Sequence, residues 1–527
     1  MLGSGSLIYQ WYWTRPLWVD EEMIALNFRD RSVFELAGPL WLHQAAPVGW
    51  LILQRALLVT FGAGERTLRA LPVLFGIATL WVAVWAGRRW LRPVGAAVFT
   101  SLCSFGLYIS FFPLETKQYS ADAFFGLLLP ALVVWTLEPV ERHGEVRQSR
   151  ILSWWLIASA ALWLANGALF TAPACAAVMG LVVFQRAGVR KALLASVPGI
   201  ILLASFGAHF WLSMRHVLHS EYLQDYWWHA FPPDDAGPLQ TLAWLASQVP
   251  MLARNPGGTE MWPAFWIAAG VGAAIALRRH FSLGAVLIAV PVSALVFGGI
   301  HLVPLEERLS LWALPPLYLA IAIAAEQLRP RLAIVAAVLA LLVSGDIVRT
   351  GVHDVRVRPR SNHNLDDRAG VGFLLAQRRP GDVLATVRLG LPAVWWYAGV
   401  NVAPPNLGRA YEPDGAPILE IRYYGPGRDC LRSDLTAALE GKSRVAIYLG
   451  FDSRFTPGFQ EMVLDTLGTL GRMTAYRTVA AEGIAAVFDL GQPPGPWSVV
   501  LTRPGGTGLP DVPRAAGCVG FFPATRW

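Results

Sequence analysis

The sequence predicts an α-helical polytopic membrane protein that ends in a small α/β domain. Composition is the first observation: of 527 residues, 54% are hydrophobic and only 15% are charged, and the mean hydropathy is +0.44. Soluble domains carry about 25% charged residues, so much of this surface must face something other than water. The 23 Trp residues are the second observation, because amphipathic rings are enriched at membrane interfaces.

Apolar runs recur along the first two thirds of the chain. Each is near the roughly 20 residues that a bilayer-spanning helix needs, and together they predict about 10–11 transmembrane helices. Two shorter segments, 46–61 and 239–252, are expected to lie in the membrane interface as amphipathic helices. The clearest spans are 70–87, 94–112, 120–137, 151–165, 168–184, 192–213, 262–278, 283–300, 309–325 and 332–348.

The connections between these spans alternate in charge. Cytoplasmic loops carry an excess of Lys and Arg, so the basic connections lie inside, and the others, including 20–69 and everything after 349, lie outside. The formal charge of +7 then reflects topology, and the apolar composition excludes nucleic acid as the expected partner. We expect a multi-pass protein of the bacterial plasma (inner) membrane. The basic connections are 88–92, 142–150, 186–191, 278–279 and 329–331.

The N-terminal end offers little for a first span. Only the short stretch 6–13 precedes the first outer loop. The sequence therefore predicts either a chain that starts late relative to its relatives or a short interfacial helix at this end.

The composition changes near residue 349, where charge, Gly and Pro rise. We expect a transmembrane domain over 1–348, which includes the outer loop 20–69 with its interfacial helices, and an extracytoplasmic α/β domain over 349–527. Cys430 and Cys518 lie in this second domain and can pair in an oxidising space. Strands are expected at 383–387 and 444–449 and in a hairpin over 473–490, and helices at 366–378, 431–440 and 457–469.

Three consecutive acids, Asp20, Glu21 and Glu22, open the first outer loop. Acidic side chains at a helix N-terminus offset the helix dipole, which is the simpler interpretation. A carboxylate at this place can also take a proton from a hydroxyl as a general base. The residues alone leave both interpretations open.

A second set of ionisable residues faces the same side of the membrane. Glu115, Lys117 and Tyr119 join two spans, while Arg69 and Arg308 each precede an apolar span. Anchoring at lipid headgroups and a local Glu–Lys pair would explain each residue singly. Charged residues at the edge of a span are nevertheless costly and often functional, and Arg binds phosphate bidentately. Their shared face favours a lipid-anchored phosphate as substrate.

The order of these motifs has a known parallel. Asp20-Glu21 comes first, Phe61-Gly62-x-Gly64-Glu65 runs on to Arg69, Glu115-x-Lys117-x-Tyr119 follows, and Glu307-Arg308 precedes a Leu/Pro-rich span. Over residues 15–330 this order resembles the GT-C superfamily of membrane glycosyltransferases. The similar branch contains the protein O-mannosyltransferases and the lipid A aminoarabinose transferase.

The resemblance implies an inverting hexosyl- or pentosyltransferase that moves a sugar from a polyprenyl-phosphate donor to an acceptor hydroxyl. The acceptor would be a glycan, lipid or protein of the cell envelope, and membrane lipids would surround the enzyme. Asp20 maps to the family's base, with Glu21 beside it, and Lys117 and Arg308 map to residues that bind the donor phosphate. Arg69, Glu115 and Tyr119 complete the expected substrate-binding set.

No cofactor or metal is predicted, although Asp20, Glu21 and Glu115 could hold a divalent cation. Two other functions stay open. A lipid-linked-sugar transporter or flippase would need polar residues near the membrane midplane, where this chain has few. A non-catalytic membrane protein that binds glycan through its outer domain would tolerate loss of Asp20.

Overall fold

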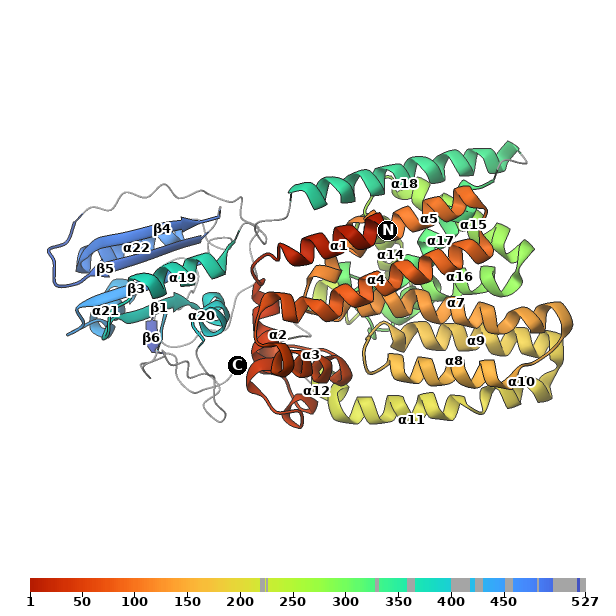
Figure 1. The fold of residues 1–527 in the computed structure, drawn as a ribbon, viewed down its shortest axis with the longest axis horizontal. Helices are drawn as coiled ribbons and strands as arrows, with labels where there is room; N and C mark the ends of the chain where they lie inside the picture. The colour runs from red at the N-terminus through yellow and green to blue at the C-terminus, as the bar shows by residue number, and fades with distance from the viewer. Residues whose placement is uncertain are drawn as a thin grey trace. The chain divides into compact units, whose positions relative to one another are not determined.

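The protein is described from a computed structural model, whose ribbon is drawn in Figure 1. The chain divides into two compact units by its internal contacts. The membrane unit comprises Met1–Trp13, Val33–Pro39 and Ala45–Pro359, and the C-terminal unit comprises Thr14–Ser32, Leu40–Gln44 and Arg360–Trp527. The structure describes residues 1–218, 223, 226–327, 331–357, 365–399, 418–421, 430–450, 458–480, 483–495 and 519–521.

This division differs from the boundaries expected from the sequence. Residues 1–348 were expected to form one domain, but the contacts group Thr14–Ser32 and Leu40–Gln44 with the C-terminal unit. The reason lies in long-range hydrogen bonds: the backbone N–H of Leu17, for example, donates to Tyr397, 380 positions further along the chain. Such pairs leave no local pattern from which a boundary could be predicted.

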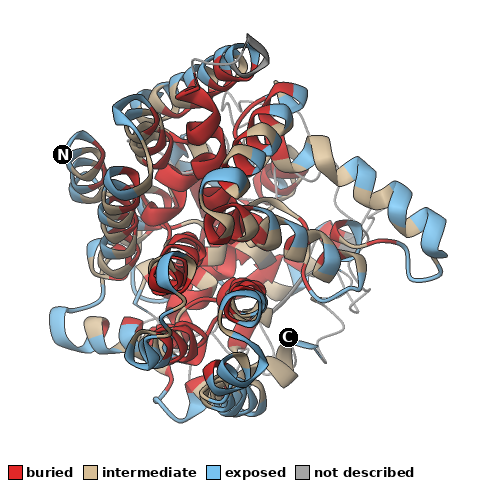
Figure 2. Cartoon of the chain, turned by 90° about the vertical axis from the view of Figure 1, so that its right-hand side faces the viewer, coloured by how far each residue is buried: buried red, intermediate tan, exposed pale blue. Residues whose placement is uncertain are grey.

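The membrane unit consists of helices, and its long apolar helices run alongside one another (Figure 1). Figure 2 shows buried positions on the inner faces of these helices and exposed positions on their outer faces. The helices are α1 (Leu2–Tyr12), α3 (Val48–Phe61), α4 (Glu65–Trp90), α5 (Pro93–Phe105), α6 (Leu107–Phe111), α7 (Tyr119–His143), α8 (Gln148–Ala161), α9 (Ala168–Ala187), α10 (Val189–Ser196), α11 (Gly199–His209), α12 (Arg215–Leu218), α14 (Pro238–Arg254), α15 (Trp262–Arg279), α16 (Phe281–Gly299), α17 (Leu314–Ala325) and α18 (Arg331–Val357).

Every predicted span overlaps one or more helical segments, and the chain is a multi-pass membrane protein. Within the described residues, seven helices are long and apolar enough to cross a membrane, or eight if α5 and the bent segment Leu107–Leu114 count as one span. This number is below the ten or eleven expected. The difference comes partly from α8, which has 14 residues, and α15, whose 18 residues include Arg278 and Arg279.

The predicted break inside 151–184 is confirmed, because α8 ends at Ala161 and α9 begins at Ala168. The short apolar segments 46–61 and 239–252 are helical, as α3 and α14. At 14 and 17 residues both are shorter than the roughly 20 residues of a full span. At the N-terminal end, the weak stretch 6–13 lies mostly within α1.

The C-terminal unit is an α/β domain around a six-stranded sheet of order β4-β5-β3-β1-β2-β6. Strand β1 runs parallel to β2 and β3, while β5 is antiparallel to β3 and β4, and β6 is antiparallel to β2. Its strands are β1 (Val383–Val387), β2 (Leu419–Ile421), β3 (Arg444–Leu449), β4 (Arg472–Val479), β5 (Gly483–Asp489) and β6 (Val519–Phe521); its helices are α2 (Val19–Asp30), α19 (Asp367–Gln377), α20 (Leu391–Tyr397), α21 (Cys430–Ala438) and α22 (Phe459–Leu470).

The predicted elements of this domain are confirmed. Strands β1 and β3, the hairpin of β4 and β5, and helices α19, α21 and α22 all lie where the sequence patterns place them. The sequence missed β2, β6 and α20. Glu482, within the expected hairpin over 473–490, and Cys518, a member of the cysteine pair expected to form a disulfide, lie outside the described residues. Cys103 and Cys175 in the membrane unit are buried free thiols.

Candidate active site

The three consecutive acids Asp20, Glu21 and Glu22 occupy the first turn of α2, and each has a different environment. Asp20 is partly exposed. Glu21 is 1% exposed, and its Oε2 accepts a hydrogen bond of 3.0 Å from the backbone N–H of Trp18. Glu21 thus caps its own helix, which supports the structural interpretation for this residue. Glu22 is fully buried. Among the three, only Asp20 is left with solvent access.

The connection between η3 (Phe112–Leu114) and α7 carries charge in a buried position. Glu115, Lys117 and Tyr119 are 7%, 8% and 4% exposed. Burying a charged group is unfavourable unless it gains a partner or serves a ligand. Simple snorkelling of Lys117 to the headgroups does not fit this burial, because a snorkelling side chain keeps its charge in water.

Helix α3 connects this buried segment to Arg69. Gln54 Nε2 donates to the carbonyl of Leu68 at 2.9 Å and to the carbonyl of Thr116 at 3.2 Å. Trp50 Nε1 also donates to the Thr116 carbonyl, at 3.2 Å. One side-chain nitrogen therefore contacts the residues directly before Arg69 and Lys117. The backbone segments that carry these two cations are therefore joined through Gln54, and Arg69 is 1% exposed.

The Leu68 carbonyl needs this donor for a local reason. It lies in α4, and the residue four positions later is Pro72, which has no backbone N–H to donate. Gln54, itself fully buried, supplies the missing hydrogen bond. The polar Gln54 within the largely apolar stretch 46–61 is the signal from which this role could have been inferred.

Gln54→Leu keeps the volume of the side chain and removes both hydrogen bonds. We expect the free energy of unfolding to fall by about 1–3 kcal/mol, because a buried carbonyl is left without its donor. Thermal unfolding of the purified protein measures this change. Gln10→Leu is the matched control, since Gln10 bonds only to Ser6 within α1. Equal melting temperatures for the two variants would contradict the bridging role.

Arg308 lies in η6 (Glu307–Ala313), and the fold brings it to Tyr119. Its guanidinium carbon is 5.7 Å from the ring centre of Tyr119 and 5.6 Å from that of Trp227. Both distances lie within the roughly 6 Å of a cation–π contact. Arg308 also lies 3.5 Å from the Glu307 carboxylate. Two aromatic rings thus orient the planar guanidinium, and Trp227 was not predicted from the sequence.

The structure therefore groups the predicted residues in two sets. Asp20 and Glu21 belong to the C-terminal unit, whereas Arg69, Glu115, Lys117, Tyr119 and Arg308 belong to the membrane unit. A nearby acid, Asp122 in α7, has a structural role: its Oδ1 accepts a 2.7 Å hydrogen bond from the backbone N–H of Gly167, directly before α9.

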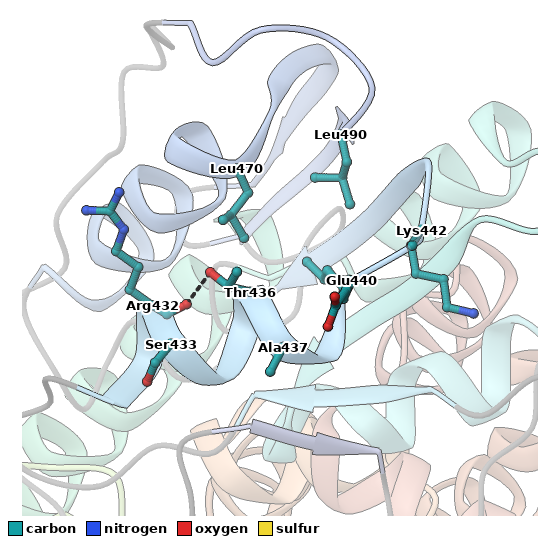
Figure 3. A pocket seen from close by; sticks show the side chains of 10 residues that line it. Arg432, Ser433, Thr436, Ala437, Glu440, Lys442, Leu470 and Leu490 are labelled. Carbon is teal, nitrogen blue, oxygen red and sulfur yellow. Dashed lines mark hydrogen bonds between the residues drawn. The ribbon is translucent and has the colours of Figure 1, made fainter.

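Other features of the described residues do not extend this set. No group of three His, Cys, Asp or Glu side chains within them is placed to hold a metal ion; the absence of a metal requirement stays a prediction. A hollow of about 890 Å³ lies between α21 and the ends of α22 and β5, with Leu470 and Leu490 on one side and Glu440 and Lys442 on the other (Figure 3). None of the predicted site residues lines it.

The helical membrane unit with an α/β domain defines a known class of fold. A structure of ArnT from Cupriavidus metallidurans in the apo state superimposes with a TM-score of 0.51, at 12% identity, over 94% of this chain and 98% of that one. A structure of the same enzyme bound to undecaprenyl phosphate gives a TM-score of 0.52, at 13% identity, over 94% and 99%. No model of a known protein family matches, and no curated protein sequence does.

ArnT is the lipid A aminoarabinose transferase, a GT-C enzyme. The chain thus has an ArnT-like polytopic membrane fold with a small α/β domain, as the sequence predicted. At this level of identity the likeness concerns the fold.

Proposed function

We propose that this protein is a glycosyltransferase that moves a sugar from a polyprenyl-phosphate donor to an acceptor hydroxyl at the outer face of the plasma membrane. The observation that carries the proposal is the burial of two cations, Arg69 and Lys117, on backbone segments that Gln54 joins within the membrane unit. Buried, preorganised cations stabilise charge that develops on a leaving phosphate. The ArnT structure with bound undecaprenyl phosphate supports a polyprenyl phosphate as the lipid part of the donor.

The roles follow from the chemistry of each group. The acceptor oxygen attacks the anomeric carbon while its proton passes to Asp20, the partly exposed acid of α2. The bond between that carbon and the phosphate oxygen breaks, and polyprenyl phosphate leaves with the electron pair. Lys117 and Arg308 counter the charge on this phosphate, and Arg69 supports them. Attack from the side opposite the phosphate inverts the anomeric configuration.

The other members of the expected set fit secondary roles in this scheme. Glu115 is a hydrogen-bond acceptor for hydroxyl groups of the sugar, and Tyr119 presents its ring to Arg308. Glu21, which caps α2, supports the placement of Asp20. Neither a metal ion nor an organic cofactor is required in the proposed reaction, because the donor arrives already activated by its phosphate.

The deciding experiment is to incubate the purified protein with a panel of polyprenyl-phosphate sugars and to measure release of polyprenyl phosphate. Release that depends on an added acceptor extract supports the proposal. A transporter or a glycan-binding protein would release none from any donor. The panel should contain both hexose and pentose donors, since the sugar class is part of what is tested.

The proposed site faces outward only if the C-terminal unit is extracytoplasmic. The basic connections between spans predict this orientation. A reporter enzyme that works only outside the cytoplasm, fused after the last residue, is expected to be active. Activity of a reporter that works only in the cytoplasm would reverse the orientation and place the site on the inner face.

A further inference from the structure

Helix α2, which carries Asp20, is attached at both ends to α20 of the C-terminal unit. Ahead of its first turn, the backbone N–H of Leu17 donates to the Tyr397 hydroxyl at 2.8 Å. In its last turn, Arg29 Nη1 donates to the carbonyl of Trp395 at 2.9 Å, and its guanidinium carbon lies 5.5 Å from the ring centre of Trp396. The helix is thus a structural part of this domain, although it is remote from it in sequence.

A buried polar cluster makes a third attachment near the start of the helix. The carboxyl group of Glu22 in α2 faces that of Asp367, the first residue of α19. The hydroxyl of Tyr448 in β3 donates to Oδ1 of Asp367. All three side chains are buried. Two carboxyl groups can share a hydrogen bond only when one of them carries a proton.

A glycine allows this cluster to form. Gly370 lies one turn after Asp367, and a Cβ atom at this position would stand 2.3 Å from Cε2 of the Tyr448 ring. Because no side chain intervenes, α19 approaches β3 closely and brings Asp367 to the Tyr448 hydroxyl.

An apolar contact would attach α2 with less desolvation cost than a buried pair of acids. The burial of both Glu22 and Asp367 is therefore not explained by packing alone.

We propose that Glu22, Asp367 and Tyr448 form a carboxyl clamp that fixes α2 on the C-terminal domain and so sets the place of Asp20. Glu22 is two residues from Asp20 and lies on the same helical turn. Glu22 and Asp367 are positioning residues in this proposal, because they act through α2 and do not touch substrate. The role given to Asp20 rests on the proposed function, whereas the attachment of α2 does not.

The clamp makes the attachment dependent on pH. Asp367 is faced by Glu22 from α2, Tyr448 from β3 and Asp366 on its own helix. Burial raises the pKa of Asp367 from 3.8 to about 6, so the folded state favours the protonated acid. This stabilisation is complete below the unfolded pKa and is lost as the pH rises through about 6. The attachment of α2 should therefore weaken as the pH rises from about 4 to about 7.

Hydrogen exchange of the α2 backbone amides in the purified full-length protein tests the clamp directly. In Asp367→Ala, α2 should exchange at least about 10-fold faster at pH 5.5, as expected for a lost hydrogen bond between buried polar groups. The amides of β3 and β5 should keep their protection. Tyr448→Phe, which removes only the hydroxyl, should give a smaller change in the same direction. Glu440→Gln, an exposed acid of the same domain, is the matched control.

Asp367→Asn separates the clamp from a general effect on stability. Its amide can donate to the Glu22 carboxylate and accept from Tyr448 without a shared proton. Exchange of α2, corrected for the intrinsic rate, should then be flat from pH 5.5 to pH 8, whereas it rises in the wild-type protein. In the transfer assay, Asp367→Ala should lower kcat and leave the donor KM unchanged, and Asp367→Asn should restore kcat.

Unchanged α2 exchange in Asp367→Ala would overturn the clamp, and so would equal loss of protection in α2, β3 and β5. A change of donor KM with constant kcat would overturn the positioning role. Failure of the wild-type protein to transfer any sugar would refute the proposed function alone. The exchange experiment needs no substrate, so it would still decide whether the clamp exists.

Discussion

Asp20→Asn is expected to lower turnover by about 100-fold or more, which is the range for loss of a general base. The amide keeps the size of the side chain but cannot take the proton of the acceptor hydroxyl. Donor binding and the melting temperature should stay near the wild-type values, because Asp20 is partly exposed, and exposed substitutions usually change stability by about 0.5 kcal/mol or less. Single-turnover measurements with saturating donor isolate the chemical step.

The control for this variant is the neighbouring acid. Glu21→Gln retains an oxygen that can accept from the Trp18 backbone N–H, as Glu21 Oε2 does, so the helix cap survives. Its turnover should therefore fall much less than that of Asp20→Asn. Near-normal turnover in Asp20→Asn combined with loss in Glu21→Gln or Glu115→Gln would reassign the base. Normal transfer in all three variants would remove a carboxylate from the mechanism.

Arg308→Ala is expected to lower kcat/KM for the donor by about 10- to 100-fold, since a charge-assisted contact contributes roughly 1.5–3 kcal/mol. Arg308→Lys should recover only part of this loss. Lys keeps the charge but cannot present a planar fork to a phosphate or stack on the rings of Tyr119 and Trp227 in the same way. Steady-state kinetics over a range of donor concentrations give both parameters.

A second arginine provides the matched control. Arg215 stacks on Trp211 with its guanidinium carbon 4.2 Å from the ring centre, so Arg215→Ala removes a similar cation–π contact from the same unit. Donor kinetics should be unaffected by this change. If Arg308→Ala behaves like Arg215→Ala, the phosphate site lies elsewhere. Lys117→Ala should resemble Arg308→Ala, because both cations are assigned to the same phosphate.

The helices of the membrane unit were predictable because their signal is local. A run of apolar residues specifies a helix whatever it packs against, and the break between α8 and α9 coincides with a visible polar interruption at Asn166. Strands β1 and β3 were equally clear from their β-branched and apolar residues. By contrast, β2 and β6 have three residues each, too few for a periodic pattern to show.

The residue types of the candidate site were predictable from the sequence, but the contacts between the site residues and their neighbours were not. The positions of Arg69, Lys117 and Arg308 before or between spans marked them as candidates. That Arg308 stacks on Trp227, and that Gln54 joins the segments of Arg69 and Lys117, depends on tertiary contacts between distant residues. The same holds for Glu22, whose partner Asp367 is far along the chain, so the three adjacent acids could not be told apart.

The attachment of α2 to α20 has a consequence for biogenesis. Leu17 leaves the ribosome 380 residues before its partner Tyr397, and contacts of such separation form late in folding. The membrane helices between α2 and α20 are synthesised first, and until α20 follows, α2 has no surface of the C-terminal unit to pack against. A chain truncated before α20 would contain every proposed phosphate-binding residue, but its α2 could not form the hydrogen bonds to α20 that hold it in place. Asp20 could therefore reach its final position only after the C-terminal unit has been synthesised as far as α20.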